Sequence, residues 1–253
     1  MQLLSDPCIL IASICAVTLA GLSKGGFGGT MGMLGVPIMA LVISPVQAAA
    51  ILLPIYIIMD IFSLWSWRRE FDLQTLKIML PAGVVGIAIG WITAAYVSDS
   101  SVRLLVGIIS VGFVVNYYIS KLRKRVQSTQ PHRPLLGGIC GTVAGFTSFI
   151  AHTGGPPYQV YTLPLGQSPR IFTGTSVRFF FIINVIKLVP YFALGQFDAT
   201  NLKTSFALMP LAVISTLVGA WIVKRMRPDV FYPLMYVLML LAGMKLLFDG
   251  LQF

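Results

Sequence analysis

Residues 101–134 read SVRLLVGIISVGFVVNYYISKLRKRVQSTQPHRP. Residues 101–120 contain one charged side chain, Arg103, and roughly 20 mainly apolar residues are enough to cross a bilayer as a helix. Residues 121–134 are the most polar stretch of the chain and carry Lys121, Arg123, Lys124, Arg125 and Arg133. An apolar span followed by a short basic segment is typical of a membrane protein, in which the charges lie between the spans.

The whole chain follows this pattern. Of its 253 residues, 57% are hydrophobic and 10% are charged, with a mean hydropathy of +0.86, whereas about a quarter of the residues of a soluble domain are charged. The alternative is a soluble protein with a very large core, but its charges would recur along helix faces instead of gathering between apolar stretches. The apolar stretches are residues 8–22, 26–43, 46–66, 76–97, 101–120, 135–150, 152–165, 170–194, 203–223 and 229–250.

The net charge of +10 orients the chain in the membrane and does not indicate nucleic-acid binding, because no polar stretch interleaves basic and aromatic residues. Cys8, Cys15 and Cys140 lie in apolar segments without metal-ligand spacing, so we interpret them as small buried hydrophobes. No metal and no cofactor are expected. The N-terminus has no basic region before its apolar run, so no cleavable signal peptide is expected.

The chain divides into two related halves, residues 1–120 and 135–253, joined by the basic linker 121–134. Matching positions occur in the same order in both halves at a slowly drifting offset, which indicates an internal duplication of the kind found in secondary transporters. The matches are Ala20-Gly21 with Ala144-Gly145, Thr30-Met31-Gly32 with Thr153-Gly154-Gly155, Ser44-Pro45 with Ser168-Pro169, Asp60 with Asn184, Phe71-Asp72 with Phe197-Asp198, Leu76-Lys77 with Leu202-Lys203, Pro81 with Pro210 and Gly90 with Gly219.

The basic residues predict that the two halves are inverted. Basic loops face the cytoplasm, and here these are residues 67–75, 121–134, 166–170 and 224–229. The segments placed outside, where Lys and Arg are absent or lie only at the edge, are residues 1–7, 44–46, 98–102, 195–202 and those after 246. The loop at Phe71-Asp72 is then cytoplasmic and its counterpart at Phe197-Asp198 external. Both termini are expected to be external, on the periplasmic side of a bacterial inner membrane.

Two Gly-rich breaks mark the expected transport site. They are Ser23–Gly29 (SKGGFGG) and His152–Pro157 (HTGGPP), and the segments 8–22 and 152–165 beside them are short for a span. Short, Gly/Pro-interrupted segments at matching positions of two halves indicate a transport site. We therefore expect an all-α integral membrane protein of about 8–10 segments, each repeat having a short broken or re-entrant helix pair and three long transmembrane helices. The alternative is ten ordinary spans, two pairs of them kinked.

Ionisable residues inside the apolar segments are candidate functional groups, because they are costly in a membrane. They are Lys24, Asp60, His152, Arg178, Lys187 and Lys245. Because the basic residues in this set outnumber the one acidic residue, Asp60, the set favours binding of an anion. Lys24 is expected in the first break, where exposed backbone N–H groups would help to cradle an anion; the alternative is a structural lysine at a helix C-terminus. Arg178 either binds an oxyanion with its planar fork or extends to the cytoplasmic surface.

The remaining candidates are weaker. Asp60 either pairs with a lysine or carries a coupling proton, Lys187 could extend outward, and Lys245 with Asp249 is best explained as an interfacial helix pair. His152 either binds the anion or relays a proton, and His132 is expected to be exposed in the linker. The predicted substrate-binding residues are Lys24, Gly25, Gly26, Gln47, His152, Thr153, Gly154, Gly155, Tyr158, Gln159, Thr175 and Arg178, with Asp60, Asn184 and Lys187 as coupling or structural polar residues.

The two breaks and their surroundings resemble the TauE/SafE sulfite exporter family. The first-half run is GLSKGGFGGTMGMLGVPIMAL, and the second-half run GFTSFIAHTGGPPYQVYTLPLGQSPRIFTGTSVRFFFIINVIKLVPYFALGQFD is most similar to the TauE-type branch. The resemblance covers nearly the whole chain. It implies an inner-membrane exporter of sulfite, sulfonates or related anions. Arg178 stands where many relatives are expected to have an uncharged residue.

Together these observations predict a secondary transporter of a small sulfur-containing anion, working by alternating access and coupled to protons through Asp60 or His152. The expected partners are that anion, the lipid bilayer and a coupling proton. The alternatives are an anion channel, or a carrier for another carboxylate or oxyanion. A membrane enzyme is not expected, because the sequence shows no nucleophile–base arrangement and only two histidines.

Overall fold

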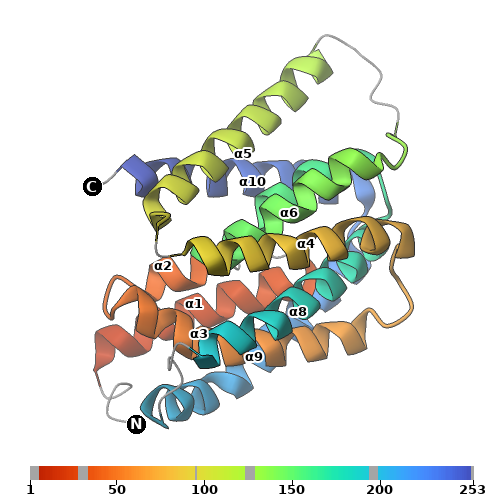
Figure 1. Cartoon of the computed structure of the whole chain (residues 1–253). Helices are drawn as coiled ribbons and strands as arrows, with labels where there is room; N and C mark the ends of the chain where they lie inside the picture. The colour runs from red at the N-terminus through yellow and green to blue at the C-terminus, as the bar shows by residue number, and fades with distance from the viewer. Residues whose placement is uncertain (1–5, 28–33, 95, 123–128, 194–198, 252–253) are drawn as a thin grey trace. The chain divides into compact units, whose positions relative to one another are not determined.

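The computed structural model describes residues 6–27, 34–94, 96–122, 129–193 and 199–251, and within these ranges the regular structure is entirely helical (Figure 1). The elements are α1 (Pro7–Gly26), α2 (Gly35–Met39), α3 (Pro45–Ser66), α4 (Leu73–Thr93), α5 (Asp99–Leu122), α6 (Pro134–Ala151), α7 (Gly155–Thr162), the 3₁₀ turn η3 (Leu163–Leu165), α8 (Pro169–Ala193), α9 (Ala199–Arg225) and α10 (Pro228–Leu251).

Eight helices of the described chain are long and apolar enough to cross a membrane: α1, α3, α4, α5, α6, α8, α9 and α10. This confirms the all-α membrane class. The two short helices, α2 with 5 residues and α7 with 8, each follow a long helix. The prediction of a short first segment at residues 8–22 was wrong, because α1 continues through Gly26 and reaches 20 residues.

Close packing explains why α1 stays helical through its glycines. A Cβ atom on Gly25 would overlap the backbone carbonyl of Thr216 in α9, and one on Gly21 would overlap the side chain of Ser215. Small residues at a crossing let two helix backbones approach, which favours helix association in membranes. The tertiary contact with α9 thus offsets the low helix propensity of these glycines.

The described helices form two compact units. Unit 1 contains residues 1–71 and 173–225, and unit 2 contains residues 72–172 and 226–253. In unit 1, α9 packs along both α1 and α3; in unit 2, α4 packs along α6 and α5 along α10. Each unit therefore combines segments from both halves of the sequence.

The surface of the long helices is rich in large apolar side chains. Trp65 of α3, Ile92 of α4 and Phe206 of α9 are each more than half exposed, as suits helices that face lipid. Cys8 and Cys15 of α1 are also exposed, so the expectation that all three cysteines are buried was wrong for these two; Cys140 is buried. The physical reason is that an apolar residue of a membrane helix can face lipid instead of the protein core.

Candidate functional site

A buried polar cluster joins three helices of unit 1. The Nζ atom of Lys24 in α1 lies 2.6 Å from Oδ1 of Asp60 in α3, and the side-chain amide of Asn184 in α8 donates to Oδ2 of Asp60 at 2.7 Å. Lys24 is 9% exposed, Asp60 1% and Asn184 4%. Both carboxylate oxygens of Asp60 are thus hydrogen-bonded inside the protein. The sequence offset of 124 predicted that Asp60 and Asn184 are matching positions of two repeats, and in the structure their side chains bond directly.

Lys187 adds a second buried cation to this cluster. It lies one helical turn after Asn184 in α8, is 1% exposed, and interacts electrostatically with both Lys24 and Asp60. Its expected extension to the membrane surface is therefore wrong, since the surrounding helices bury it. In their ordinary protonation states, Lys24, Lys187 and Asp60 carry two positive charges and one negative charge. This excess is costly in a low-dielectric interior and favours a bound anion.

Lys24 occupies the last turn of α1 and not an unwound break. The final carbonyls of α1 accept hydrogen bonds from side chains: Ser63 Oγ to Lys24 O at 3.1 Å, Trp67 Nε1 to Gly25 O at 2.7 Å and Thr173 Oγ1 to Gly26 O at 2.8 Å. The environment at Lys24 is the negative end of a helix, which stabilises its ammonium group. The geometry here is that of the structural alternative, and it differs from the N–H cradle expected at Gly25 and Gly26. Gly28, Gly29 and Thr30-Met31-Gly32 lie outside the described residues.

Arg178 holds the C-terminal end of α3. Its Nη1 donates to the carbonyls of Trp67 at 3.1 Å and Gly174 at 2.9 Å, and its Nη2 donates to the carbonyl of Arg68 at 2.8 Å. The guanidinium also lies 4.0 Å from the ring centre of Phe71. These contacts direct the planar fork of Arg178 towards three backbone carbonyls, two of which, those of Trp67 and Arg68, directly follow the last residue of α3.

The second break is present in unit 2, between α6 and α7. His152 ends α6 in the left-handed region at φ 54°, and Thr153 is tied to Thr147 in both directions: the N–H of Thr153 donates to Thr147 O at 3.1 Å and Thr147 Oγ1 donates to Thr153 O at 3.4 Å. Gly154 precedes α7, which begins at Gly155. Tyr158 and Gln159 in α7 are completely buried.

Gln47 and Thr175 lie in unit 1. The amide of Gln47 donates to Asn201 Oδ1 of α9 at 3.2 Å. Gln47 is thirteen residues before Asp60 on α3, about 20 Å along the helix at 1.5 Å per residue, so it is not part of the Lys24–Asp60 cluster. Thr175 is completely buried on α8, one turn before Arg178.

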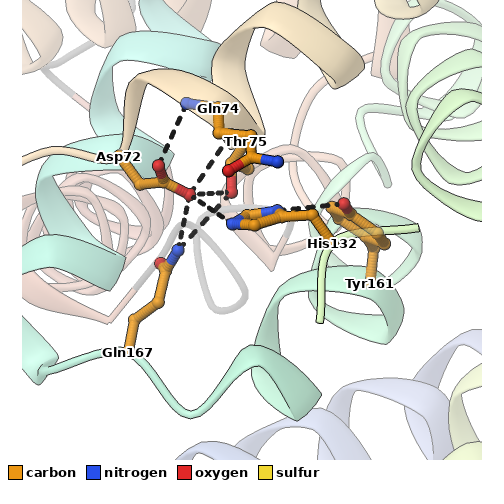
Figure 2. Close-up of polar contacts among 6 residues, drawn as sticks. All are labelled: Asp72, Gln74, Thr75, His132, Tyr161 and Gln167. Atoms are coloured by element: carbon orange, nitrogen blue, oxygen red, sulfur yellow. Dashed lines mark hydrogen bonds and ion pairs between the residues drawn. The ribbon is translucent and has the colours of Figure 1, made fainter. Parts of the chain in front are cut away.

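A second polar cluster, which lies in unit 2, was not predicted. Oδ2 of Asp72 accepts from Thr75 Oγ1 at 2.5 Å and Gln167 Nε2 at 2.8 Å and lies 3.2 Å from His132 Nε2, while His132 Nδ1 lies 3.2 Å from the hydroxyl of Tyr161 (Figure 2). The side chain of His132 is 21% exposed, so its expected exposure in the linker was wrong. A signal did exist, because an Asp directly before an apolar helical run is a typical N-cap.

The Asp72 cluster also bears on sidedness. Asp72, His132 and Gln167 come from three loops that the basic residues predict to be cytoplasmic. The hydroxyl of Tyr232, at the start of α10, donates to the carbonyl of Gln167.

Partial burial acts to raise the pKa of the Asp72 carboxyl. Hydrogen bonds from Thr75 and from the backbone N–H of Gln74, together with the charge of His132, outweigh this effect and lower the pKa below its ordinary value.

Lys245 and Asp249 pair one turn apart on α10, which confirms the expected helix pair, and Asp249 also lies 3.9 Å from Arg103 of α5. Among the described residues, no group of three or more His, Cys, Asp or Glu side chains could hold a metal ion.

Comparison with known proteins agrees with this architecture. The sequence model of the family described as "Sulfite exporter TauE/SafE" matches residues 13–246, nearly the whole chain. No curated protein and no solved structure matches the chain. With eight apolar helices of spanning length in the described part of the chain as well, the chain belongs to the TauE/SafE sulfite exporter family and is a multi-pass membrane transporter, not an enzyme.

Proposed function

We propose that the protein is a secondary transporter that exports small sulfur-containing anions, such as sulfite or organosulfonates, across a bacterial inner membrane. The observation that carries the proposal is the buried cluster of Lys24, Lys187 and Asp60, where two lysine side chains stand beside one aspartate side chain. A bound monoanion would balance the remaining charge, and its oxygens would accept hydrogen bonds from the ammonium groups. Buried cations of this kind in membrane helices mark substrate paths.

The second break supports the same proposal. His152, Thr153 and Gly154 place non-helical backbone between α6 and α7, which is tolerated at membrane depth where it is buried in protein or lines a cavity. Because Pro156 and Pro157 have no N–H, donors for an anion at this break would come from the residues before them and from side chains such as Tyr158 and Gln159.

The mechanism that we propose is alternating access by two inverted repeats, residues 1–120 and 135–253. If α1 corresponds to α6 and α9 to α4, the pairs α1–α9 in unit 1 and α6–α4 in unit 2 are equivalent. The bond between the repeat-related Asp60 and Asn184 also supports an internal duplication. Asp60 or His152 would then couple transport to protons, with both termini on the periplasmic side.

The experiment is flux into proteoliposomes that contain the full chain, with sulfite, taurine and sulfoacetate as candidate substrates and with or without a pH gradient. We expect saturable, gradient-dependent flux of at least one anion in the wild type and at least about tenfold less in Lys187→Gln, because a charge-assisted contact is worth about 1.5–3 kcal/mol. Lys245→Gln is the matched control, since Lys245 is 46% exposed and paired on the surface of α10; it should retain wild-type flux.

The outcomes separate the alternatives. If folded wild type carries none of the three anions, the sulfur substrate class is wrong and a wider screen of carboxylates and oxyanions follows. Flux that neither saturates nor runs uphill with the gradient would indicate a channel. Normal flux in folded Lys187→Gln would remove the buried cluster from the transport site.

A further inference from the structure

A pocket of about 500 Å³ lies in unit 2, in a region that the proposed transport site does not use. Its walls come from the last turns of α5, the segment 129–133, η3 with the turn that follows it, and the first turns of α10. This volume falls in the range of small-molecule sites, which is about 300–1,000 Å³. It is larger than a phosphate or sulfite ion needs.

The chemistry of the lining favours an anion with an apolar body. Arg133 is the cation of the lining, and none of the lining residues, all of them in the described part of the chain, is acidic. Asn116 and Ser120 of α5 add hydrogen-bonding groups. The rings of Tyr117 and Tyr236 stack with their centres 3.6 Å apart and form an apolar wall.

The backbone that carries Arg133 is fixed from two sides. His132, the preceding residue, lies against Asp72 and Tyr161, and the carbonyl of Arg133 accepts from Gly137 N–H at 2.9 Å. In the same segment, Gln130 N–H donates to Pro164 O at 3.0 Å. The Asp72 cluster of Figure 2 thus holds His132, the residue next to Arg133, and so fixes the backbone from which the exposed Arg133 side chain extends.

The position of the pocket indicates the source of the ligand. Its residues lie at the ends of two membrane helices, α5 and α10, next to the basic linker. Helix ends lie at the membrane–water interface, where tyrosines such as those of this lining are enriched. Apolar side chains such as Val115 and Leu122 are exposed on the same part of α5, and Lys121 is an exposed cation in its last turn. Basic pockets between membrane helices on the cytoplasmic side suit anionic lipid headgroups.

We propose that this pocket binds the phosphate ester of an anionic membrane lipid, with Arg133 holding the phosphate oxygens and the tyrosine wall contacting the glycerol and the start of an acyl chain. Arg133 binds the phosphate through its planar fork, which suits phosphate geometry. The site is separate from anion transport, so the proposal does not depend on the transported substrate.

The test is native mass spectrometry of the full chain in detergent, titrated with short-chain phosphatidylglycerol, phosphatidylcholine or glycerol 3-phosphate. We expect tighter binding of phosphatidylglycerol than of phosphatidylcholine, and about tenfold weaker phosphatidylglycerol binding in Arg133→Gln, from the loss of a charged contact. Arg227→Gln is the matched control, because Arg227 directly precedes α10, is 80% exposed and pairs with Asp229. The lipid affinity of this variant should match that of the wild type.

A second variant keeps the test decisive if Arg133→Gln fails to fold. Asn116→Leu preserves every charge but removes a polar group of the lining, and it should also weaken phosphatidylglycerol binding. Equal binding of phosphatidylglycerol to wild type and to folded variants, or equal binding of the two lipids, overturns the proposal. Glycerol 3-phosphate binding as tightly as the lipid, and lost in Arg133→Gln, supports the phosphate site but overturns the membrane as its source.

Discussion

Asp60 is the carboxylate that two buried lysines of unit 1, Lys24 and Lys187, share. It accepts from Lys24 and Asn184, and Lys187 interacts with it electrostatically. Removing one partner of a buried ion pair leaves an uncompensated charge, which is far more costly than removing both. The transport site that we propose would thus also be a condition for folding.

Asp60→Asn should therefore destabilise the protein by about 3–5 kcal/mol, since it keeps the shape of the side chain but leaves two buried ammonium groups without their carboxylate. The measurement is thermal unfolding in detergent. Asp229→Asn is the control, because the Arg227–Asp229 pair is 80% and 61% exposed and such surface pairs contribute about 0–1 kcal/mol. Equal melting temperatures for the two variants would show that the buried pair does not stabilise unit 1.

Arg178 gives a second prediction at this scale. Arg178→Lys keeps the charge but loses the fork that bonds Trp67, Arg68 and Gly174, so the end of α3 should open more often. Hydrogen exchange of the amides near residues 67–71 should be faster by about tenfold, with little change in α4. Unchanged exchange there would mean that the three hydrogen bonds do not hold the end of α3.

Sequence reasoning found these residues but not their surroundings. The offset of 124 between Asp60 and Asn184 identified a pair that does bond. Nothing local in the sequence predicts that Ser63, Trp67 and Thr173 donate to the end of α1, because those donors come from other helices. Tertiary contacts also decide that Lys24 is helical and that Lys187 is buried.

At the scale of single elements, α4 depends on its N-cap. Asp72 accepts from the N–H groups of Gln74 and Thr75 at 3.0 and 3.2 Å, which satisfies two donors at the start of the helix. The folded-state pKa of Asp72 is lowered, so the stability that its charge contributes is complete above the unfolded pKa of about 3.9 and is lost as pH falls through the folded value.

Acidification should accordingly lower the melting temperature of the wild type below about pH 4, and the decline should be smaller in Asp72→Asn. Asn is itself a good N-cap residue, so the variant keeps α4 capped while it removes the titrating group. Melting curves collected in steps between pH 7 and pH 3 would measure this. Parallel pH profiles of the two proteins would exclude Asp72 from the acid response.

The pairing of α6 with α4 depends on a glycine in the same way as that of α1 with α9. A Cβ atom on Gly145 would overlap the carbonyl of Gly83, whereas one on Gly138 of the same helix meets no atom within 4 Å. Gly145→Ala should cost about 1–3 kcal/mol through overpacking. Gly138→Ala should be neutral or slightly stabilising, because alanine favours the helix. Equal melting temperatures would contradict the close approach of α4 and α6.

Element lengths show where sequence reasoning stops. Hydropathy located the long helices, because roughly 20 apolar residues are a strong signal. It underestimated α1, since glycines read as a break remain helical against α9. The break at His152 was recognised correctly, because Pro156 and Pro157 remove two donors and end the helical pattern whatever packs nearby.

On the scale of the whole molecule, the chain order does not predict the compact units. Both units take helices from both halves of the sequence. Packing between helices such as α1 and α9 gives no local signal in the sequence, since each contact joins residues far apart along the chain. The offsets between the halves predict a duplication, and only the tertiary contacts assign helices to units.

The sidedness of unit 2 can be tested without knowledge of the substrate. Asp72 precedes α4 and Ser98 follows it; with 21 residues, α4 is about 32 Å long and matches a hydrocarbon core of about 30 Å. Gln167, which bonds Asp72, is next to Ser168. Ser168 and Ser98 should therefore lie on opposite sides of the membrane, with Ser168 in the cytoplasm and Ser98 outside.

Single cysteines at these exposed positions, Ser168→Cys and Ser98→Cys, would be placed in a chain whose Cys8, Cys15 and Cys140 are replaced by Ala. In intact spheroplasts, a membrane-impermeant maleimide should label Ser98→Cys and leave Ser168→Cys unlabelled until the membrane is opened. Gln130→Cys in the linker should behave like Ser168→Cys, because Gln130 bonds Pro164 in the same part of unit 2. Reversed labelling of all three would invert the proposed orientation, whereas Ser168→Cys and Gln130→Cys reacting from different sides would contradict the arrangement of the loops around Asp72.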